Sequence, residues 1–496
     1  MKIIHVTSEF FPYAKTGGLA DMVGSLAATL ADKGHEIAVF VPGYRSILEH
    51  TDAKQAKPLL QLENNGGEVR VFSPRKNLTI YLLCNDIFFN RSGIYGIDGH
   101  DFNDNHHRYM FFSKGVIETM RLLRLHAHVL HCHDWQTALL PMLLRYTEQR
   151  YCVKLAKKTI FTIHNLAFQG KFPVGSFNQS ELPEVMSDMK SPDKIDEINM
   201  LKNGLLFADQ VTTVSPRYAR EIQTMAFGCG LNDVVATRAN RLIGLINGID
   251  LAVWNPVTDI HLPARYCAKN IGGKHICRSE LLNRHLFEPD FSGPVFGMVC
   301  RLTEQKGIDL LLKNRDFFSG ESKLIILGAG EKHYEDALCQ MATTAPDRIS
   351  FIKGFDESLS HLVAAGSDFF LMPSLFEPCG LNQMYSQTYG TVPLVSNVGG
   401  LFDTVTDIDE HPDAGTGLTF LPTASEFRHG LNRAFTLYNE KPRYAAVQQR
   451  AMKVDFGWGK AAKAYEQLYM DSNPATASDM PASLYVSPHT SVALPV

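Results

Sequence analysis

The stretch SLFEPCGLNQMYSQTYGTVPLVSNVGGL, residues 374–401, decides the fold, because it combines a polar loop, a helix pattern and a strand pattern. The run before it, DFFLMP (368–373), is nearly all apolar and predicts a buried strand. Pro378 fixes its own φ angle and disfavours helical geometry at Glu377. The carboxylate of Glu377 is therefore expected at a rigid bend directly after a strand.

The rest of this stretch predicts a helix and a second strand. The helix is expected to begin near Gly380 and to run to about Tyr389, ending at Gly390. Its free backbone N–H groups would then face the end of the preceding strand, where open α/β sheets bind anions. The sequence VPLVS supplies the next strand. One such β-loop-α-β unit is common in any α/β core, so a functional interpretation depends on further units of this kind.

Composition indicates a protein of more than one domain without a strong net charge. A chain of 496 residues is too long for one hydrophobic core, and 45% hydrophobic with 20% charged residues is typical of globular proteins. The net charge of -4 favours neither nucleic acid nor an anionic membrane as a partner. We expect no membrane span and no cleavable signal. Nine cysteines without C-x-x-C spacing argue against disulfides and a zinc ribbon, and favour the cytoplasm.

A second unit of the same kind opens the chain. Strands are expected at 2–7 and 35–42, with a helix at 19–30 between them. The first loop contains Lys15 followed by Gly17 and Gly18. Paired glycines let the backbone approach a ligand closely, and a lysine can meet an anionic group. The lysine precedes the glycines, so this is no P-loop, and a plain tight turn is the alternative explanation.

Polar residues also follow two later strands. In HAHVLHCHDWQTALLPMLL (126–144), a strand precedes a helix for which Asp134 is the expected N-cap and, secondly, a site residue. Four histidines within eight residues suggest a metal site. Their mixed parity on a strand, and the lack of a carboxylate or cysteine partner, lead us to expect none. TIFTIHNLAFQG (159–170) places His164 and Asn165 at a strand end, where a purely structural histidine is the alternative.

The second half repeats the pattern. VFGMVC predicts a strand, and the loop RLTEQKG after it contains Arg301 and Lys306. Two cations beside a helix N-terminus would suit a diphosphate, although a solvated surface pair is the alternative. We divide the chain into two α/β domains, a closing amphipathic helix and a tail. Their expected ranges are 1–245, 246–455, 456–470 and 471–496, and the composition of the tail predicts disorder.

Seven motifs in this order resemble bacterial glycogen synthases and the related plant starch synthases. They are SEFFPYAKTGGLADMVGSL, HCHDW, FTIHNLAFQG, VSPRYAREI, NGIDLAVWNP, RLTEQKGIDL and the stretch 374–401, and together they cover the chain to about residue 470. The resemblance implies the GT-B architecture, with two Rossmann-like domains facing a cleft and the last helix returning to the first domain. It implies retaining transfer of glucose from ADP-glucose to the non-reducing 4-OH of an α-1,4-glucan, without a metal or cofactor.

The same resemblance implies roles for individual residues. Glu377 and His164 match residues beside the transferred glucose, and Arg301 with Lys306 matches the pair that neutralises the diphosphate. Further positions match donor contacts: Lys15, Gly17, Gly18, Asn247, Phe355, Cys379, Gly380, Leu381 and Asn382. Those that match sugar or acceptor contacts are Asp21, Tyr95, Asp134 and Asn165. Asn382 stands where Thr is usual, and Phe355 stands where Tyr is frequent.

Three alternatives remain open from the sequence. UDP-glucose or another acceptor would give a related transferase. A glucan- or nucleotide-binding protein with a decayed site is a second alternative, against which the intact set of charged residues argues. A dinucleotide oxidoreductase is a third, although no G-x-G-x-x-G follows the first strand. Because only one carboxylate stands out at a strand end, a hydrolase with paired carboxylates is disfavoured.

Overall fold

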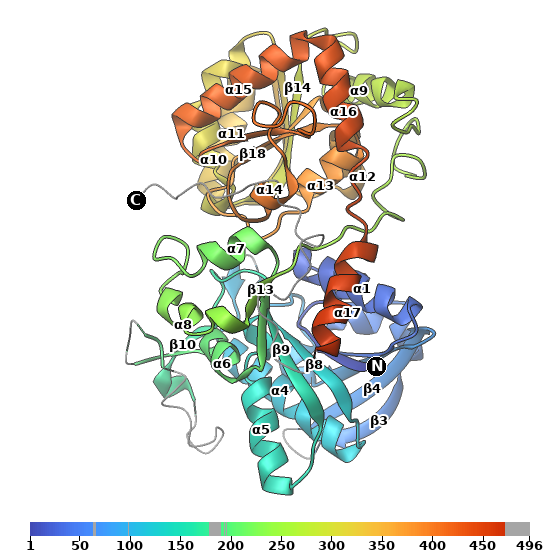
Figure 1. The fold of residues 1–496 in the computed structure, drawn as a ribbon, viewed down its shortest axis with the longest axis vertical. Coiled ribbons are helices and arrows are strands. Elements are labelled where there is room, and N and C mark those ends of the chain that lie inside the picture. Colours follow the sequence, from blue (N-terminus) through green and yellow to red (C-terminus); the bar gives the residue numbers. More distant parts are fainter. Residues whose placement is uncertain (63–65, 98, 178–189, 193, 195, 472–496) are drawn as a thin grey trace. The chain divides into compact units, whose positions relative to one another are not determined.

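A computed structural model describes residues 1–62, 66–97, 99–177, 190–192, 194 and 196–471, which form two compact α/β units (Figure 1). The first unit contains residues 1–248 and the helix α17 (Trp458–Met470), and the second contains Ile249–Gly457. The chain thus passes between the units at 248/249 and 457/458, where the sequence predicted 245/246 and 455/456. Residues 472–496, for which the sequence predicts disorder, lie outside the described residues.

A nine-stranded sheet forms the centre of the first unit, in the order β13-β12-β9-β8-β1-β2-β5-β4-β3. The strands from β13 to β5 are parallel to one another, and β4 pairs antiparallel with both β5 and β3. The strands are β1 (Lys2–Val6), β2 (Glu36–Pro42), β3 (Lys57–Leu62), β4 (Gly67–Arg75), β5 (Leu78–Cys84), β8 (Ala127–His133), β9 (Ala156–Ile163), β12 (Gln210–Thr213) and β13 (Leu242–Gly244).

Helices follow several of these strands, and the helix predicted at 19–30 is present as the first of them. The main ones are α1 (Gly18–Asp32), α4 (Asn105–Leu122), α5 (Leu140–Tyr151), α6 (Met200–Phe207) and α7 (Pro216–Glu221). The segment 93–109 is rich in Gly, Asp, Asn and His, a composition that predicts a surface loop, but α4 already begins at Asn105 and Tyr109 is fully buried. The prediction is wrong there because Arg108, also fully buried, donates to the carbonyls of Phe88 (2.7 Å) and Ile94 (2.9 Å).

Helix α17, red in Figure 1, packs beside α1 of the first unit. Glu466 of this helix pairs with Lys33 (2.5 Å) and His35 (2.8 Å) just after α1. At the end of the helix, the hydroxyl of Tyr469 bonds Nδ1 of His131 on β8 (2.8 Å). The last helix of the described chain is therefore part of the core of the first unit.

The second unit is built on a six-stranded parallel sheet in the order β16-β15-β14-β17-β18-β19. Its strands are β14 (Val295–Leu302), β15 (Lys323–Gly330), β16 (Ile349–Lys353), β17 (Phe369–Met372), β18 (Val392–Ser396) and β19 (Leu418–Phe420). Its longer helices are α9 (Gly272–Arg284), α11 (Lys332–Thr344), α12 (Glu357–Gly366), α15 (Ala424–Asn439) and α16 (Lys441–Ala451), and the short α10 (Ile308–Lys313), α13 (Asn382–Thr388) and α14 (Gly399–Thr404) follow strand ends. In the described part of the chain, no helix is both long and apolar enough to cross a bilayer.

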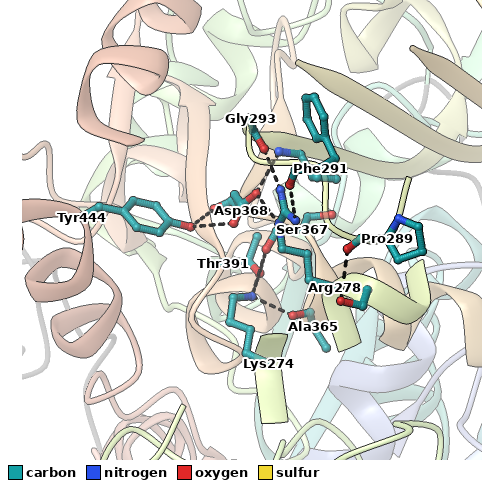
Figure 2. Close-up of polar contacts among 12 residues, drawn as sticks. Lys274, Arg278, Pro289, Phe291, Gly293, Ala365, Ser367, Asp368, Thr391 and Tyr444 are labelled. Carbon is teal, nitrogen blue, oxygen red and sulfur yellow. Dashed lines mark hydrogen bonds and ion pairs between the residues drawn. The ribbon is translucent and has the colours of Figure 1, made fainter. Parts of the chain in front are cut away.

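A buried lysine on α9 fixes the ends of the sheet opposite to the predicted site loops. Figure 2 shows Lys274 donating from Nζ to the carbonyls of Ala365 (2.7 Å) and Ser367 (2.9 Å) and to the hydroxyl of Thr391 (2.6 Å). Ser367 precedes β17 and Thr391 precedes β18. Burial lowers the pKa of Lys274 to about 7, because the ammonium group loses its contact with water. The three acceptors replace the hydrogen bonds that water would otherwise make with this group.

One turn further along α9, Arg278 anchors the same region. Its guanidinium contacts the carboxylate of Asp368 (3.1 Å) and the carbonyls of Phe291 (2.8 Å) and Gly293 (2.6 Å), as Figure 2 shows. Asp368 also accepts from the backbone N–H of Val295 (2.9 Å) at the start of β14. These contacts tie the starts of β14 and β17 together, and the far ends of the same two strands lead into the loops with the predicted catalytic residues.

Replacing Lys274 by Met is expected to lower the free energy of unfolding of the second unit by about 2–4 kcal/mol, because buried carbonyls lose their donor. Urea unfolding monitored by the fluorescence of Trp254 measures this, since that is the one tryptophan in the second unit. The exposed Lys332, paired with Asp336 on α11, supplies the control Lys332→Met, expected within about 0.5 kcal/mol of the parent. Equal urea midpoints for Lys274→Met and Lys332→Met would contradict the stabilising role of Lys274.

Candidate active site

In each unit, several of the predicted residues follow strands at which the order of the sheet reverses. In the second unit the chain runs from β14 to β15 and β16 on one side, and then continues at β17 on the other side of β14. In the first unit β2 and β8 flank β1 in the same way. Ligands of open α/β sheets bind beyond the carboxyl ends of strands at such reversals. Each unit therefore has one set of candidate residues at its switch point.

The centre of the set in the second unit is an ion pair between Lys306 and Glu377, whose Nζ and Oε2 atoms are 2.5 Å apart. Both are largely buried, with Glu377 only 5% exposed. The hydroxyl of Ser374 donates to the same carboxylate oxygen (3.1 Å). The backbone N–H of Leu375 donates to the carbonyl of Gln305 (2.8 Å), which joins the loops after β17 and β14. The sequence predicted both charged residues but not that they pair with each other.

Glycines allow these loops to approach so closely. A Cβ atom at Gly307, where φ is +66°, would lie 1.8 Å from the carbonyl oxygen of Pro373. A Cβ atom at Gly400 would lie 2.1 Å from the carbonyl oxygen of Cys379, while the N–H of Gly400 donates to the carbonyl of Glu377 (3.0 Å). A larger residue at Gly307 would push apart the loops after β14 and β17. A larger residue at Gly400 would push the loop after β17 away from the start of α14, and either change would displace Glu377.

Arg301 differs from Lys306 in having its charge available. It lies near the end of β14 and is exposed. Within the described part of the chain its guanidinium makes no hydrogen bond or ion pair. The guanidinium can therefore bind an anionic ligand without first breaking a contact, whereas Lys306 already shares its charge with Glu377.

The remaining predicted donor residues of this unit are only partly brought together. Helix α13 begins at Asn382, two residues later than predicted, and the side chain of Asn382 donates to the carbonyl of Val299 (2.7 Å). Cys379 is buried, Gly380 has a φ of +70° and Leu381 is partly exposed. Phe355 is 77% exposed and follows β16, which β15 separates from β14.

In the first unit, the loop after β1 is organised by Glu9, which the sequence analysis missed. Its buried carboxylate accepts from the N–H (2.6 Å) and the hydroxyl (2.6 Å) of Thr16, from the N–H of Gly17 (3.1 Å) and from the hydroxyl of Tyr95 (2.7 Å). The predicted backbone donor of Gly17 is thus already used within the protein, and Gly18 begins α1. The sequence signal that could have identified Glu9 is an acidic residue two positions after the strand predicted at 2–7.

Two further predicted residues of this loop contact each other. Lys15 and Asp21 form an ion pair of 2.8 Å between the loop and the first turn of α1. The side chain of Lys15 is 44% exposed, so the pair contributes at most about 1 kcal/mol to stability. Because the pair is weak and exposed, Lys15 can exchange Asp21 for another anion at low cost.

Asp134 follows β8, which pairs with β1, and His164 and Asn165 follow β9 on the other side of β8. Asp134 has a φ of +57°, and its carboxylate accepts from the backbone N–H of His164 (2.7 Å). Asp134 does occupy the N-cap position, before the 3-10 turn Trp135–Thr137, but its side chain makes no capping hydrogen bond there. Burial, with a smaller contribution from the charge of nearby Glu9, raises the pKa of Asp134 to about 7, against the lowering effect of the His164 N–H. Asn165 caps its own turn by accepting from Ala167 N–H (3.0 Å).

Asn247 is set apart from this group. It follows β13, which β12 separates from β9, at the edge of the sheet. It is buried, and its Oδ1 atom has no hydrogen-bond partner among the described residues. The structure therefore does not bring Asn247 into contact with the other predicted residues of the first unit.

Two of the four histidines in the stretch 126–133, His131 and His133, form a cluster with a histidine of β1. His131 and His133 share one face of β8 because they are two residues apart, and His5 of β1 joins them with ring nitrogens within 4.8 Å. The three imidazoles are fully buried. The set contains no carboxylate or thiolate, and its ring nitrogens are in hydrogen bonds except for Nε2 of His5.

Replacing Glu9 by Gln is expected to raise KM for the donor that the sequence resemblance implies by about tenfold, because a Gln side chain accepts hydrogen bonds only at its carbonyl oxygen, while its NH2 group would face other donors. The thermal midpoint should fall as well. Tyr95→Phe removes one of the four donors to Glu9 and is expected to have a smaller effect on KM. A KM unchanged in Glu9→Gln would show that the loop is held by other contacts.

Comparison with known proteins identifies the family of this chain. Residues 2–237 match the starch synthase catalytic domain, and residues 287–452 match the glycosyl transferases group 1. Glycogen synthase of Opitutus terrae is 58% identical over 95% of this chain and 100% of its own length. Glycogen synthase of Myxococcus xanthus is 42% identical over 95% and 99%.

Solved structures support the same relationship. The catalytic domain of starch synthase IV from Arabidopsis thaliana, bound to ADP and acarbose, is 30% identical with a TM-score of 0.82, covering 95% of this chain and 99% of that one. Sucrose-phosphate synthase from Thermosynechococcus elongatus, at 16% identity and a TM-score of 0.59 over 94% and 98%, shares the fold. The chain therefore belongs to the glycogen synthase family and is a glycosyltransferase of the starch and glycogen synthase type, with the GT-B architecture, a nucleotide-sugar donor and a glucan acceptor.

Proposed function

We propose that this protein transfers the glucosyl group of ADP-glucose to the non-reducing 4-OH of an α-1,4-glucan, with retention of configuration and release of ADP, in the cytoplasm. The observation that carries the proposal is the buried pair Lys306–Glu377 at the switch point of the second unit, in the same unit as the unpaired Arg301. This combination provides both signs of charge that the reaction requires.

The chemistry explains why both signs are needed. Departure of the nucleotide develops negative charge on the diphosphate, which Arg301 and Lys306 would stabilise. The glucosyl carbon gains positive, oxocarbenium-like character, which the carboxylate of Glu377 would favour. As the diphosphate leaves, Lys306 can shift its interaction from Glu377 toward the leaving group, and the carboxylate is then released to face the sugar. The interaction therefore becomes stronger in the transition state than in the ground state.

We assign the other residues by the same logic. The second unit would bind the donor, with Phe355 stacking on the nucleobase, and the first unit would bind the glucan. His164 would contact the donor sugar, and Lys15 would contact a donor phosphate. Since these cations can neutralise the diphosphate, we propose that no metal is required. Full activity in excess EDTA is the expected result.

ADP-glucose is favoured as the donor over UDP-glucose because the related plant starch synthase was solved with ADP. Radiolabelled ADP-glucose and UDP-glucose, each offered with glycogen, test the proposal, with Glu377→Ala as the control. Incorporation from ADP-glucose that falls sharply in the variant would support both the donor and the role of Glu377. Incorporation from UDP-glucose alone would show that the donor is UDP-glucose and not ADP-glucose. No incorporation from either donor, in a folded protein that binds glycogen, would indicate a glucan-binding protein in place of an enzyme.

A further inference from the structure

Three histidines from three neighbouring strands form a hydrogen-bonded chain in the first unit. Nε2 of His164, directly after β9, lies 3.1 Å from Nδ1 of His133 at the end of β8. Nε2 of His133 lies 3.1 Å from Nδ1 of His5 on β1. His5 and His133 are fully buried, whereas His164 is partly exposed. The chain therefore connects the interior of the sheet with the edge where the candidate site residues lie.

A fourth histidine packs against this chain without taking part in it. The ring of His131 lies 4.1 Å from the ring of His133. Its own nitrogens bond the hydroxyls of Thr162 (2.6 Å) and Tyr469 (2.8 Å). Because both nitrogens are engaged, His131 is fixed in place, and it restricts rotation of the His133 ring.

All three members of the chain are neutral. Burial lowers the pKa of His5 and of His164 to about 3 and lowers the pKa of His133 well below its usual value. A neutral imidazole has one N–H donor and one bare nitrogen that accepts. The chain can therefore run in only two directions. Either every ring carries its proton on Nδ1, or every ring carries it on Nε2.

The buried end of the chain distinguishes the two directions. Nε2 of His5 is buried and has no partner within the described residues. If the rings carried their protons on Nε2, an N–H group would be buried there without an acceptor, which proteins avoid more strictly than a bare acceptor. If they carry them on Nδ1, His5 donates to His133, His133 donates to His164, and the N–H at Nδ1 of His164 remains available.

We propose that His133, supported by His5, is a positioning residue that holds His164 in the Nδ1-protonated tautomer, ready to donate a hydrogen bond to an oxygen of the bound glucosyl group. This inference rests on the proposed function, in which His164 contacts the donor sugar. His133 acts only through His164 and needs no contact with the substrate.

The tautomer can be measured without any activity. Long-range 1H–15N correlation spectra of the full-length protein labelled with 15N-histidine distinguish Nδ1–H from Nε2–H, and a His164→Gln variant assigns the signals. A protonated Nδ1 and a bare Nε2 in His164 are expected. A protonated Nε2 would overturn the proposal, whether or not the protein transfers glucose.

A matched pair of variants tests the consequence for turnover. In His133→Asn the amide nitrogen takes the place of Nδ1 and still donates to His164, whereas in His133→Asp only acceptors remain. Both variants lose the contact with His5 equally. We expect His133→Asn to retain kcat within about threefold and His133→Asp to lower it about 10–100-fold, with little change in KM for ADP-glucose. Equal values of kcat in the two variants would overturn the proposal.

Misfolding of a variant and failure of the proposed function each give a result that differs from failure of this inference. Thermal midpoints show whether His133→Asp is folded, and if it is not, the spectrum of the parent protein still decides. Failure of the proposed function would appear as no incorporation from any nucleotide sugar in the parent. Failure of the inference would appear as normal incorporation in the parent together with the wrong tautomer or with two equal variants.

Discussion

Glu377→Ala is expected to lower kcat by at least about a thousandfold while leaving KM for the nucleotide sugar within a few fold. The carboxylate is buried beside Lys306 at 2.5 Å. In the proposed mechanism, its removal takes away the group that would favour positive charge on the sugar. It also frees the ammonium of Lys306, which keeps its attraction for the diphosphate. Steady-state kinetics with ADP-glucose and glycogen measure both constants.

A buried ion pair elsewhere in the second unit provides the control. Asp407 and Arg433 lie 2.6 Å apart, with side-chain exposures of 4% and 19% against 7% and 17% for Glu377 and Lys306. Asp407→Ala should destabilise the unit to a similar degree and leave kcat near that of the parent. A Glu377→Ala variant that keeps more than about a tenth of kcat would refute the assigned role.

Arg301→Ala is expected to lower kcat by about 10²–10³-fold without changing the thermal midpoint. Its guanidinium is exposed, so truncation leaves no buried partner unpaired. Arg301→Lys should recover only part of the activity, because an ammonium keeps the charge but not the two-pronged contact with phosphate oxygens. The exposed Arg284, paired with Glu280 on α9, supplies the control Arg284→Ala, expected to behave as the parent. Unchanged turnover in Arg301→Ala would remove this residue from the diphosphate site.

Local patterns in the sequence determined several strands of both sheets and where polar residues follow them. The strand of DFFLMP occurs as predicted, as β17. Local signals also mark helix ends: Ser215 caps α7 with Pro216 as its first residue, and α1 ends just before Gly34, which has a positive φ. These features depend on residues that are close in the chain, since apolar runs, caps and glycine conformations act over a few positions. The candidate positions Lys15, His164 and Glu377 were likewise visible because each follows such a strand.

Only the tertiary structure decided which of these residues contact each other. Lys306 and Glu377 are 71 residues apart, His5 and His133 are 128 apart, and His131 and Tyr469 are 338 apart. Each pair meets because strand order places distant segments side by side, and no local pattern encodes that order. For the same reason Glu9 was missed. Its role depends on the return of the Thr16 and Gly17 amides and on Tyr95, which only the folded loop brings to its carboxylate.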